Sequence, residues 1–372
     1  MQNYDVIIAG AGPAGLSIAR ELAPSGLKVL LLDTKPKAES LKYYTCGSFI
    51  DPELYGIPKD VLNPLSQSAF CSTNCQVVKK GIAYIVDKRK LLRFLEAEAK
   101  KNQNCTIKYG TGIRKVIANR DGVDHLMLDS GNEVKAKVYV DCTGIARAIC
   151  KKVGIKPLKQ YVAFGIEYLV KLKGDSHTAD LFVGSRLKGG YGWLFPLNSK
   201  QAIVGFGTLD KEDFGDAEPR LKAMWQIQRV NQRSSPKPLE KHKGVSITGI
   251  QRHIAEKNVI CIGDSALQAT PIVGEGIRPI MEASRLAAKS VVDAVKNNDL
   301  GLLKNYQDSW SKRYYSKYFY STVTQRLLRR WSTDDSIMDR GTRRLGKLSD
   351  EDCNKLIKGD ITLGLIVKSL LK

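Results

Sequence analysis

The chain has 372 residues, 43% of them hydrophobic, which is enough for two or three domains, and no apolar run is long enough to span a bilayer. Its eight cysteines are scattered, and Cys71 and Cys75 have no histidine or second cysteine pair nearby, so we expect reduced thiols and no metal site. The net charge of +21 indicates either a solvated lysine-rich surface or an anionic partner, namely nucleic acid, a membrane surface or an acidic substrate.

Residues 4–33 predict a strand, a glycine turn, a helix and a second strand that ends in an acid. Gly10 permits the tight turn, Gly12 lets the backbone approach a pyrophosphate, and Gly15 lets the helix pack closely on the strand. The first N–H groups of the helix favour phosphate, and Asp33 can accept hydrogen bonds from ribose hydroxyls. We therefore expect a dinucleotide-binding unit. Its expected contacts are Gly10, Gly12, Ala14, Gly15 and Asp33.

After Asp33 the pattern alternates between loop, helix and short strands. A loop rich in Lys, Tyr, Gly and Pro runs to about residue 64, and its residues 43–49 are typical of a close-packed turn. A strand at residues 81–86 precedes a helix that begins at Asp87 and has apolar residues at helical spacing. Short strands are then expected at residues 105–110, 112–122, 125–131 and 133–144. The last of these is apolar, which indicates a buried parallel strand that returns to the first sheet.

The pattern changes twice more along the chain. Residues 158–248 predict a mainly antiparallel second domain, interrupted by a helical stretch near residues 218–230. A buried strand resumes at residue 258, and a helix at residues 276–297 follows a turn with Pro and Gly. The chain then becomes helical and basic, and residues 357–372 predict an amphipathic terminal helix that packs on the body. The expected domains are a split nucleotide-binding domain at 1–157 and 250–300, a substrate domain at 158–249 and a helical region at 301–372.

A third segment, residues 260–277, has the features of a cofactor contact. A strand delivers Asp264 at its end, and Gly274 and Gly276 shape a turn that opens the next helix. This arrangement resembles that of flavoproteins typified by aromatic hydroxylases. The resemblance implies FAD, with Asp264 near its ribityl and phosphate part. It also implies that Gly276 and Ile277, at the helix N-terminus, lie against the flavin, where the helix dipole stabilises the anionic reduced ring.

The middle segment carries a more specific motif. The run Tyr191-Gly-Trp193-Leu-Phe195-Pro196, followed after eight residues by Gly205-Phe-Gly207, matches the YxWxFP…GxG signature of the geranylgeranyl reductase family. The chain therefore resembles that family, and looks most similar to the archaeal enzymes that saturate membrane lipid chains. The resemblance implies substrate contacts at Tyr191, Trp193, Phe195, Pro196, Gly205 and Gly207.

Two further positions match or depart from these flavoproteins. The Cys-Gly pair that the reductase family carries after the second strand corresponds to Cys46-Gly47, which implies a place beside the flavin. Aromatic hydroxylases place Arg directly after the acid near residue 87, whereas this chain has Lys88 and then Arg89. The implied fold class is α/β, with an FAD-binding Rossmann-like domain of the aromatic hydroxylase and glutathione reductase type, an inserted antiparallel sheet domain and a helical C-terminus.

The expected reaction is the saturation of C=C bonds in geranylgeranyl chains. A prenyl chain gains about 0.8 kcal/mol for each buried methylene, so its enzyme needs a long apolar tunnel. Tyr191, Trp193 and Phe195 share one face of a strand and can line it, although they would also suit an ordinary core. The flavin supplies a hydride, aromatic faces stabilise positive charge, and another group gives a proton. Cys46 is the catalytic candidate, with a redox thiol or a merely buried residue as alternatives, and Glu275 is a second acid.

The expected partners follow from the same features. No second glycine-rich nucleotide motif is visible, so the electron donor would be a ferredoxin, a deazaflavin or transiently bound NAD(P)H. Cations and aromatic rings from Lys304 to Lys347 suit lipid headgroups, which predicts a peripheral protein at an anionic membrane surface. The first strand begins almost at Met1, which favours the cytoplasmic side.

Two rival functions use the same fold or the same charge. A flavin monooxygenase or halogenase would consume oxygen and need no prenyl tunnel. A flavoprotein that modifies tRNA would bind RNA with strong salt dependence, as the charge of +21 allows. Neither rival needs the YxWxFP…GxG motif, so no nucleic acid partner is expected.

Overall fold

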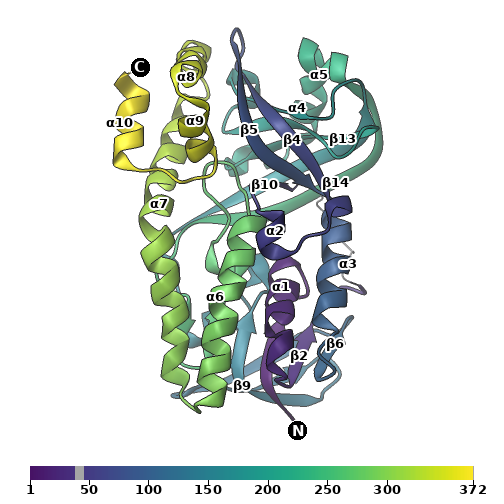
Figure 1. Cartoon of the computed structure of the whole chain (residues 1–372), viewed down its shortest axis with the longest axis vertical. Helices are drawn as coiled ribbons and strands as arrows, with labels where there is room; N and C mark the ends of the chain where they lie inside the picture. Colours follow the sequence, from purple (N-terminus) through teal and green to yellow (C-terminus); the bar gives the residue numbers. More distant parts are fainter. Residues whose placement is uncertain (38–45, 372) are drawn as a thin grey trace.

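In residues 1–37 and 46–371, which the computed structural model describes, the strands form two eight-stranded sheets, and the C-terminal helices line one side of the molecule (Figure 1). The expected fold class is confirmed: an α/β domain carries an inserted, mainly antiparallel sheet and a helical C-terminus. The turn expected at residues 43–49 lies partly outside the described residues, and its described part contains a short strand, Gly47–Ser48, rather than a turn.

The first sheet is built around buried parallel strands. Its strands are β1 (Gln2–Ala9), β2 (Val29–Leu32), β6 (Cys105–Lys108), β7 (Ile113–Asn119), β8 (Gly122–Leu128), β9 (Glu133–Asp141), β15 (Ala255–Glu256) and β16 (Val259–Cys261). The order is β15-β16-β9-β1-β2-β6, with the β7-β8 hairpin attached to β9. Because β9 pairs in parallel with β1, the predicted return of this strand to the first sheet is confirmed. Their apolar runs suit strands that are covered on both faces.

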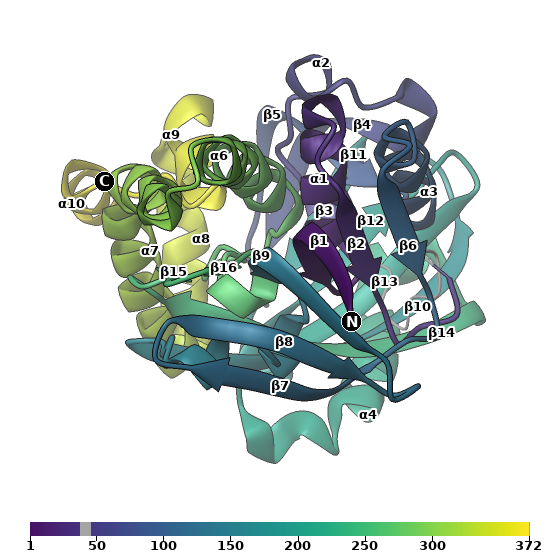
Figure 2. The same ribbon diagram turned by 90° about the horizontal axis from the view of Figure 1, so that it is seen from below.

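A layer of helices covers this sheet. Its members are α1 (Pro13–Leu22), α3 (Lys88–Ala99), α6 (Ile277–Lys296) and α7 (Lys304–Trp331). The helix α3 begins next to Asp87, as predicted, and the side chain of Asp87 caps it by accepting a hydrogen bond of 3.1 Å from the backbone N–H of Lys90. Figures 1 and 2 show α6 and α7 side by side along the sheet, with α1 next to α6.

The second sheet draws strands from both halves of the chain. They are β3 (Gly47–Ser48), β4 (Leu62–Cys71), β5 (Gln76–Val86), β10 (Lys159–Leu172), β11 (Thr178–Phe182), β12 (Gly190–Pro196), β13 (Gln201–Thr208) and β14 (Ser234–Ile250). The order is β14-β10-β13-β12-β11-β4-β5-β3. The assignment of residues 1–157 to the nucleotide domain is therefore wrong for β3, β4 and β5, which belong to the second sheet because β4 pairs with β11 and β5 pairs with both β4 and β3.

Several elements differ from the expectations of the pattern. The strands β4 and β14 were not expected, because prolines and polar residues interrupt the alternation of apolar and polar residues that indicates a strand. The helical stretch near residues 218–230 forms two helices, α4 (Ala217–Ala223) and α5 (Gln228–Arg233). A further short helix, α2 (Pro52–Tyr55), lies in the region expected to be loop.

The C-terminal region is helical, as predicted, but its aromatic rings do not all face outward. After α7 come α8 (Asp335–Lys347), α9 (Asp350–Ile357) and α10 (Leu363–Leu371). On α7, Trp310, Tyr314 and Tyr318 are buried and their rings contact one another, so the expectation that they meet lipid headgroups is wrong. These three rings are buried because this face of α7 packs on α6. Among the described residues, none of the helices is both long and apolar enough to cross a membrane.

The terminal helix is shorter than the sequence predicts. Residues 357–372 were expected to form one helix, but Gly359 has a positive φ of +74° and separates α9 from α10. Glycine adopts this left-handed conformation without strain, so the chain turns here instead of continuing.

Candidate functional site

The N-terminal glycines meet very different surroundings. Gly10 has a φ of +101°, and a Cβ on it would lie 2.3 Å from the carbonyl oxygen of Cys142. A Cβ on Gly15 would lie 1.8 Å from the carbonyl oxygen of Gly10, so the helix packs directly on the turn. By contrast, a Cβ on Gly12 would meet nothing within 4 Å. Two glycines are thus required by the fold, whereas Gly12 lies where a ligand can approach the backbone.

The start of α1 is arranged for an anion. Gly12 is its N-cap and carries no side-chain cap, and the first turn contains no acidic residue. Its N-terminal N–H groups and the positive end of the helix dipole therefore stay available to phosphate. Asp33, directly after β2, accepts hydrogen bonds from the backbone N–H groups of Ala11 at 2.6 Å and Lys35 at 2.7 Å. The carboxylate stands beside the glycine turn, at the position expected for a ribose contact.

The late segment meets this turn. A Cβ on Gly263 would lie 2.9 Å from the Cβ of Ala14, so the turn after β16 packs on the first turn of α1. Asp264 follows and accepts a hydrogen bond of 2.9 Å from the hydroxyl of Ser246 on β14. Burial raises the pKa of Asp264, and the bond to Ser246 and the charge of Lys88 oppose that rise. Segments far apart in the sequence therefore form one site.

Cys46 lies at the same junction and is buried. Burial raises the pKa of its thiol to about 12, while the positive charge of Lys88 opposes the rise and Glu275 and Glu167 add to it. These charges therefore lie near the sulfur. The thiol stays protonated at neutral pH, so Cys46 is a neutral group rather than a reactive thiolate.

The turn before α6 is held by Glu275. One carboxylate oxygen accepts hydrogen bonds of 2.9 Å from the hydroxyl of Ser48 and the backbone N–H of Phe49, and the other accepts one of 3.1 Å from Arg278. Glu275, the second candidate acid, therefore ties β3 to this turn. Gly274 has a φ of +68°. At Gly276 and the buried Ile277, α6 begins without a side-chain cap or an acid in its first turn.

Three aromatic rings on β12 form a continuous row, called here the ring row (Tyr191, Trp193 and Phe195). The ring centroids lie 5.5 Å apart for the first pair and 6.2 Å apart for the second, which confirms that the three side chains share one face. The hydroxyl of Tyr191 donates a hydrogen bond of 2.6 Å to the carbonyl oxygen of Val273. At the other end, a Cβ on Gly47 would lie 3.4 Å from Phe195. The ring row therefore joins the turn before α6 to the Cys46-Gly47 segment.

The glycines of the motif lie beneath these rings. A Cβ on Gly205 would lie 2.3 Å from the indole of Trp193, and one on Gly207 would lie 3.2 Å from it. Gly207 also stands opposite Gly165 on β10, and Gly165 stands opposite Gly244 on β14. Gly165, Gly207 and Gly244, called here the glycine strip, leave neighbouring strands without side chains. Glycine in a strand often marks a place where a ligand comes close to the backbone.

Other predicted residues have different settings. The carbonyl oxygen of Pro196 accepts a hydrogen bond of 2.8 Å from the side chain of Asn63, which links the end of β12 to β4. Arg89 forms an ion pair of 2.8 Å with Glu240 on β14, while Lys88 is the residue whose charge acts on Cys46 and Asp264. The replacement of Arg by Lys at this position thus leaves a cation in the site.

Sequence reasoning missed two buried polar residues, Glu167 and His242. They stand opposite each other on β10 and β14, and Glu167 also stands opposite Gly205. A signal was present, because Glu167 interrupts the apolar middle of β10 and a buried carboxylate is rare unless it is paired. His242 carried no comparable signal, because β14 itself was not expected.

The residues present fit FAD. Gly12 is open to a ligand, and α1 and α6 both begin with uncapped N–H groups and no acid. Asp33 and Asp264 supply carboxylates on either side of the glycine turn for hydroxyl groups. This set suits a pyrophosphate with sugar hydroxyls on both sides and an electron-rich ring at the second helix.

Comparison with known proteins agrees with this geometry. A family model described as tryptophan halogenase matches residues 64–314, and one described as FAD binding domain matches residues 3–42. Digeranylgeranylglycerophospholipid reductase 2 of Methanopyrus kandleri is 25% identical over 96% of this chain and 93% of its own, and the reductase of Picrophilus torridus is 28% identical over 100% and 95%.

A solved structure has the same fold. A geranylgeranyl bacteriochlorophyll reductase-like protein from Thermoplasma acidophilum superposes with a TM-score of 0.87 at 19% identity, over 100% of this chain and 96% of its own. The chain therefore belongs to the family that the tryptophan halogenase model describes, is similar to geranylgeranyl reductases over nearly its whole length, and is an FAD-dependent oxidoreductase.

Proposed function

We propose that this protein saturates C=C bonds of geranylgeranyl chains on archaeal-type membrane phospholipids. The names of the relatives support this substrate class. The observation that carries the proposal is the position of the ring row between the Cys46-Gly47 segment and the turn before α6, with the glycine strip on the neighbouring strands of the same sheet. A flat, weakly polar surface beside the flavin helix suits an alkene better than a polar substrate.

The protein's own groups have defined tasks in this reaction. FAD, when bound and reduced, supplies a hydride. The faces of Tyr191, Trp193 and Phe195 stabilise the positive charge that develops on the alkene, since aromatic faces attract cations. Burial of Trp193, which is 2% exposed, keeps water from that charge. Cys46, the candidate donor expected from the sequence, is a neutral thiol at this junction, but a thiol whose pKa is raised to about 12 is a poor acid at neutral pH, so another group has to supply the proton.

The apolar corridor for the rest of the chain is part of the proposal. It would run along the ring row and bury methylenes at about 0.8 kcal/mol each. Two cavities of the described residues lie elsewhere. One, of about 560 Å³, is lined by Gly81 of β5 and by residues of α9 and its following turn, and the other, of about 220 Å³, is lined by residues of β10 and β14 and of the α4–α5 region.

The membrane contact is proposed at an outer face of the C-terminal helices, called here the α7 apolar face. Its exposed apolar residues are Phe319, Val323, Leu327, Leu328 and Trp331 on α7, with Leu363 and Val367 on α10. On α7 they recur mostly every four residues, which places them along one side of the helix. Exposed cations accompany them at Arg326, Arg330, Arg340, Arg343 and Arg344. Apolar residues flanked by cations suit an anionic lipid surface.

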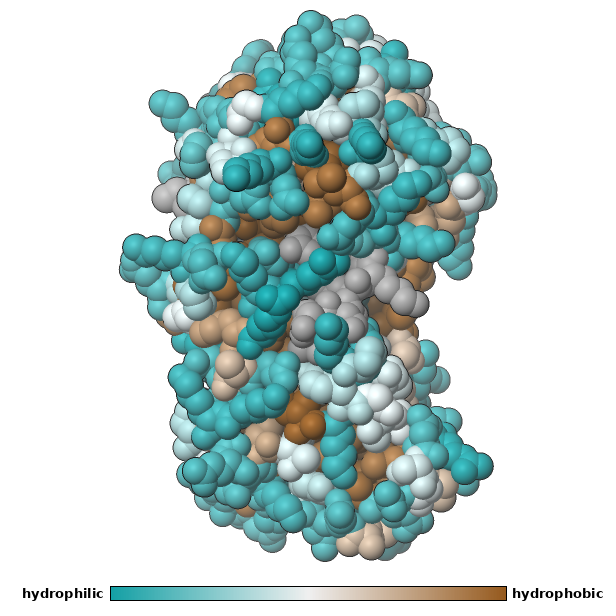
Figure 3. All heavy atoms as spheres, turned by 90° about the vertical axis from the view of Figure 1, so that its right-hand side faces the viewer, coloured by the Kyte–Doolittle hydropathy of each residue, from teal (hydrophilic) through white to brown (hydrophobic). Residues whose placement is uncertain are grey.

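The opposite side of the molecule has a different character. The face seen in Figure 3, which lies away from α7, is mostly hydrophilic with smaller hydrophobic areas. We therefore place the protein with α7 towards the cytoplasmic surface of the membrane, and an external donor, a ferredoxin, a deazaflavin or NAD(P)H, delivers electrons.

The proposal is tested by anaerobic turnover. Dithionite-reduced holoprotein is mixed with a geranylgeranyl phospholipid, and the lipid mass and the flavin absorbance are followed together. We expect gains of two hydrogens per step, matched by flavin reoxidation. Flavin reoxidation without lipid saturation would overturn the proposal. Oxygen-dependent hydroxylation or halogenation of an added aromatic, with no effect on the lipid, would favour the rival monooxygenase or halogenase.

A further inference from the structure

We propose that Glu167 and His242 relay a proton from the protein surface to the alkene site. The inference rests on the proposed function, because each saturated C=C bond gains one hydride and one proton. It identifies the route of that proton, and it rests on the position of two buried residues in the second sheet.

Glu167 lies on the face of the second sheet that carries the ring row. It stands opposite Gly205 on β13, and Gly205 in turn stands opposite Trp193, whose indole covers it. Its side chain is 0% exposed. Glu167 contributes to the raised pKa of Cys46, so its charge acts on the junction where the cofactor segments meet. The carboxyl group is therefore within the site rather than in the core behind it.

His242 connects this carboxyl group to the outside. Its Nδ1 lies 3.5 Å from an Oε of Glu167, and its Nε2 lies 2.9 Å from an Oε of Glu240. The side chain of Glu240 is 40% exposed and forms an ion pair with Arg89 of α3. The three groups therefore form a spatial chain that runs from the buried carboxyl group of Glu167 through the imidazole of His242 to the exposed carboxylate of Glu240. Each group contacts the next.

The strand geometry aims these groups at the cofactor region. Residues 240, 242, 244 and 246 alternate with exposed residues along β14, so they share its covered face. On that face, Ser246 bonds Asp264. The imidazole is therefore held on the same face of β14 that contacts the FAD segments, next to Gly244 of the glycine strip.

The charges around His242 favour its protonated form. The interaction with Glu167 raises the pKa of His242, burial lowers it, and Glu240 raises it further. The groups that face it from the packed elements are Glu167 of β10, Glu240 of β14 and Arg89 of α3, whereas Lys241 and Lys243 lie on the exposed side of β14. These charges therefore favour a protonated imidazole beside the buried Glu167 carboxylate.

The proton balance closes in each turnover. The protonated imidazole of His242 gives its Nδ1 proton to the Glu167 carboxylate, which passes it to one alkene carbon while the other carbon receives the hydride that reduced FAD supplies. His242 then regains a proton from solvent at the exposed Glu240. Both residues return to their starting states, and the only net input to the relay is one proton from water.

Glu167→Gln and His242→Gln test the relay in the holoprotein, with His125→Gln as the matched control. His125 also contacts two carboxylates, Asp124 at 2.8 Å and Glu133 at 3.6 Å, but it lies on the β8 strand of the first sheet. We expect Glu167→Gln to slow flavin reoxidation by geranylgeranyl phospholipid roughly 100-fold or more, in the range of general acid catalysis. FAD retention and reoxidation by ferricyanide, which needs no proton on carbon, should not change. Wild-type rates in both relay variants would overturn the proposal, as would an equal loss of ferricyanide reoxidation.

The pH dependence adds a readout that a structural role would not move. Because the relay needs protonated His242, the wild-type rate should fall as pH rises through the raised pKa of this histidine, and His242→Gln should lose that step. A step that persists in His242→Gln would contradict the relay.

A second measurement does not depend on activity. Histidine NMR titration of the protein without lipid should show the pKa of His242 falling in Glu167→Gln and unchanged in His125→Gln. An unchanged pKa in Glu167→Gln would overturn the coupling. If the two residues are coupled but the wild-type protein does not saturate lipid, the proposed function is wrong, and the proton route is wrong with it. A defect in the relay alone differs from this result, because the wild-type enzyme would then be active and only the relay variants would be slow.

Discussion

At the scale of single residues, the glycines of the first turn have different roles, which the space around a Cβ added to each of them distinguishes. A Cβ on Gly15 would collide with backbone, whereas a Cβ on Gly12 would meet nothing within 4 Å. The backbone of Gly12 has a negative φ of −78°, which other residues adopt without strain. Folding therefore requires Gly15, and ligand binding alone explains Gly12.

We predict that Gly12→Ala and Gly15→Ala separate these roles. Gly12→Ala should keep the thermal stability of the FAD-free protein and weaken FAD affinity about 10-fold or more, because one lost phosphate contact of 1.4 kcal/mol corresponds to that factor. Gly15→Ala should lower the stability of the FAD-free protein itself. The control is Gly341→Ala in α8, where a Cβ meets nothing within 4 Å. Thermal unfolding and FAD titration measure both, and equal stability losses in the two variants would contradict the assignment.

Trp193 gives a second residue-scale prediction. Its ring covers Gly205 and contacts both neighbours in the ring row. Trp193→Ala should reduce lipid saturation at least 10-fold while FAD stays bound, because the aromatic face beside the alkene is lost. Removal of a buried Trp side chain also destabilises a protein by about 3–5 kcal/mol, so Trp193→Phe is the companion variant that keeps a ring. Loss of FAD from Trp193→Phe would show that the residue is structural.

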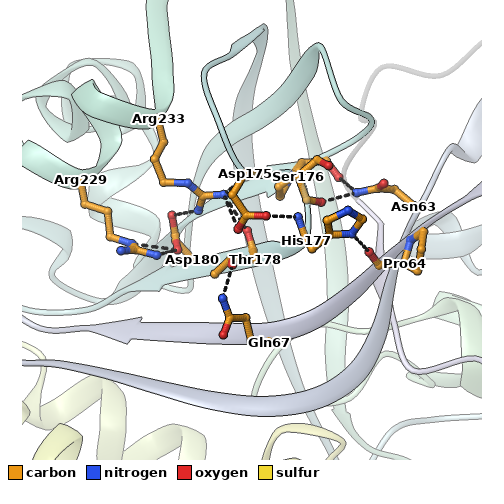
Figure 4. Close-up of polar contacts among 11 residues, drawn as sticks. Asn63, Pro64, Gln67, Asp175, Ser176, His177, Thr178, Asp180, Arg229 and Arg233 are labelled. Carbon is orange, nitrogen blue, oxygen red and sulfur yellow. Dashed lines mark hydrogen bonds and ion pairs between the residues drawn. The ribbon is translucent and has the colours of Figure 1, made fainter.

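At the scale of elements, a buried charge cluster anchors α5 to the second sheet. Asp180 of β11 is 0% exposed and forms ion pairs with Arg229, at 2.8 Å, and with Arg233 (Figure 4). Arg233 also donates a hydrogen bond of 3.1 Å to the carbonyl oxygen of Thr178. One short helix is thus held by two arginines on a single buried carboxylate.

Asp180→Ala should destabilise the fold by about 3 kcal/mol, because it leaves two arginines beside an empty buried position. Asp175→Ala is the matched control. It removes a carboxylate that is 46% exposed and lies 3.7 Å from Arg233, so its expected effect is below about 1 kcal/mol. Urea unfolding followed by circular dichroism measures the difference. Similar losses of stability in the two variants would mean that the buried carboxylate of Asp180 contributes no more to the free energy of unfolding than the exposed one of Asp175.

At the scale of the whole molecule, the charge of +21 and the α7 apolar face together predict membrane binding. Part of the basic segment is already used internally, since Arg313 pairs with Glu282, Lys317 with Asp360 and Arg329 with Asp210. The surface contribution therefore comes from the cations that remain exposed on α7 and α8.

Leu327→Glu with Trp331→Glu should weaken binding to vesicles that contain phosphatidylglycerol, by about 10-fold or more, since apolar area is lost and anionic repulsion is added. Leu239→Glu with Val245→Glu is the control, because it adds the same charge at two exposed apolar residues of β14. Co-sedimentation at low and high salt measures the affinity, which should fall with salt. An equal loss in the control would mean that net charge alone governs binding.

The sequence predicted the local elements well wherever the local pattern and the tertiary structure agree. Short stretches of sequence were enough to predict the glycine turn, α1, the start of α3 at Asp87, the parallel return of β9 and the start of α6. The ring row was also predicted to share one face, because strand alternation is a local property. These features depend on backbone preferences and periodicity, which any stretch of a few residues carries.

The remaining features required distant segments to meet. Nothing local in the residues of β3, β4 and β5 says that they join the second sheet, or that Trp310, Tyr314 and Tyr318 are buried against α6 rather than exposed to lipid. The pairing of Glu167 with His242 joins strands whose residues are far apart in the chain. The sequence by itself determined the FAD-type turn, the helix starts and the aromatic motif, whereas only the tertiary structure decided which charges surround Cys46 and which cations stay on the surface. The reason is that the burial and the electrostatic environment of a residue depend on contacts between segments far apart in the sequence, and such contacts produce no periodic pattern in the sequence.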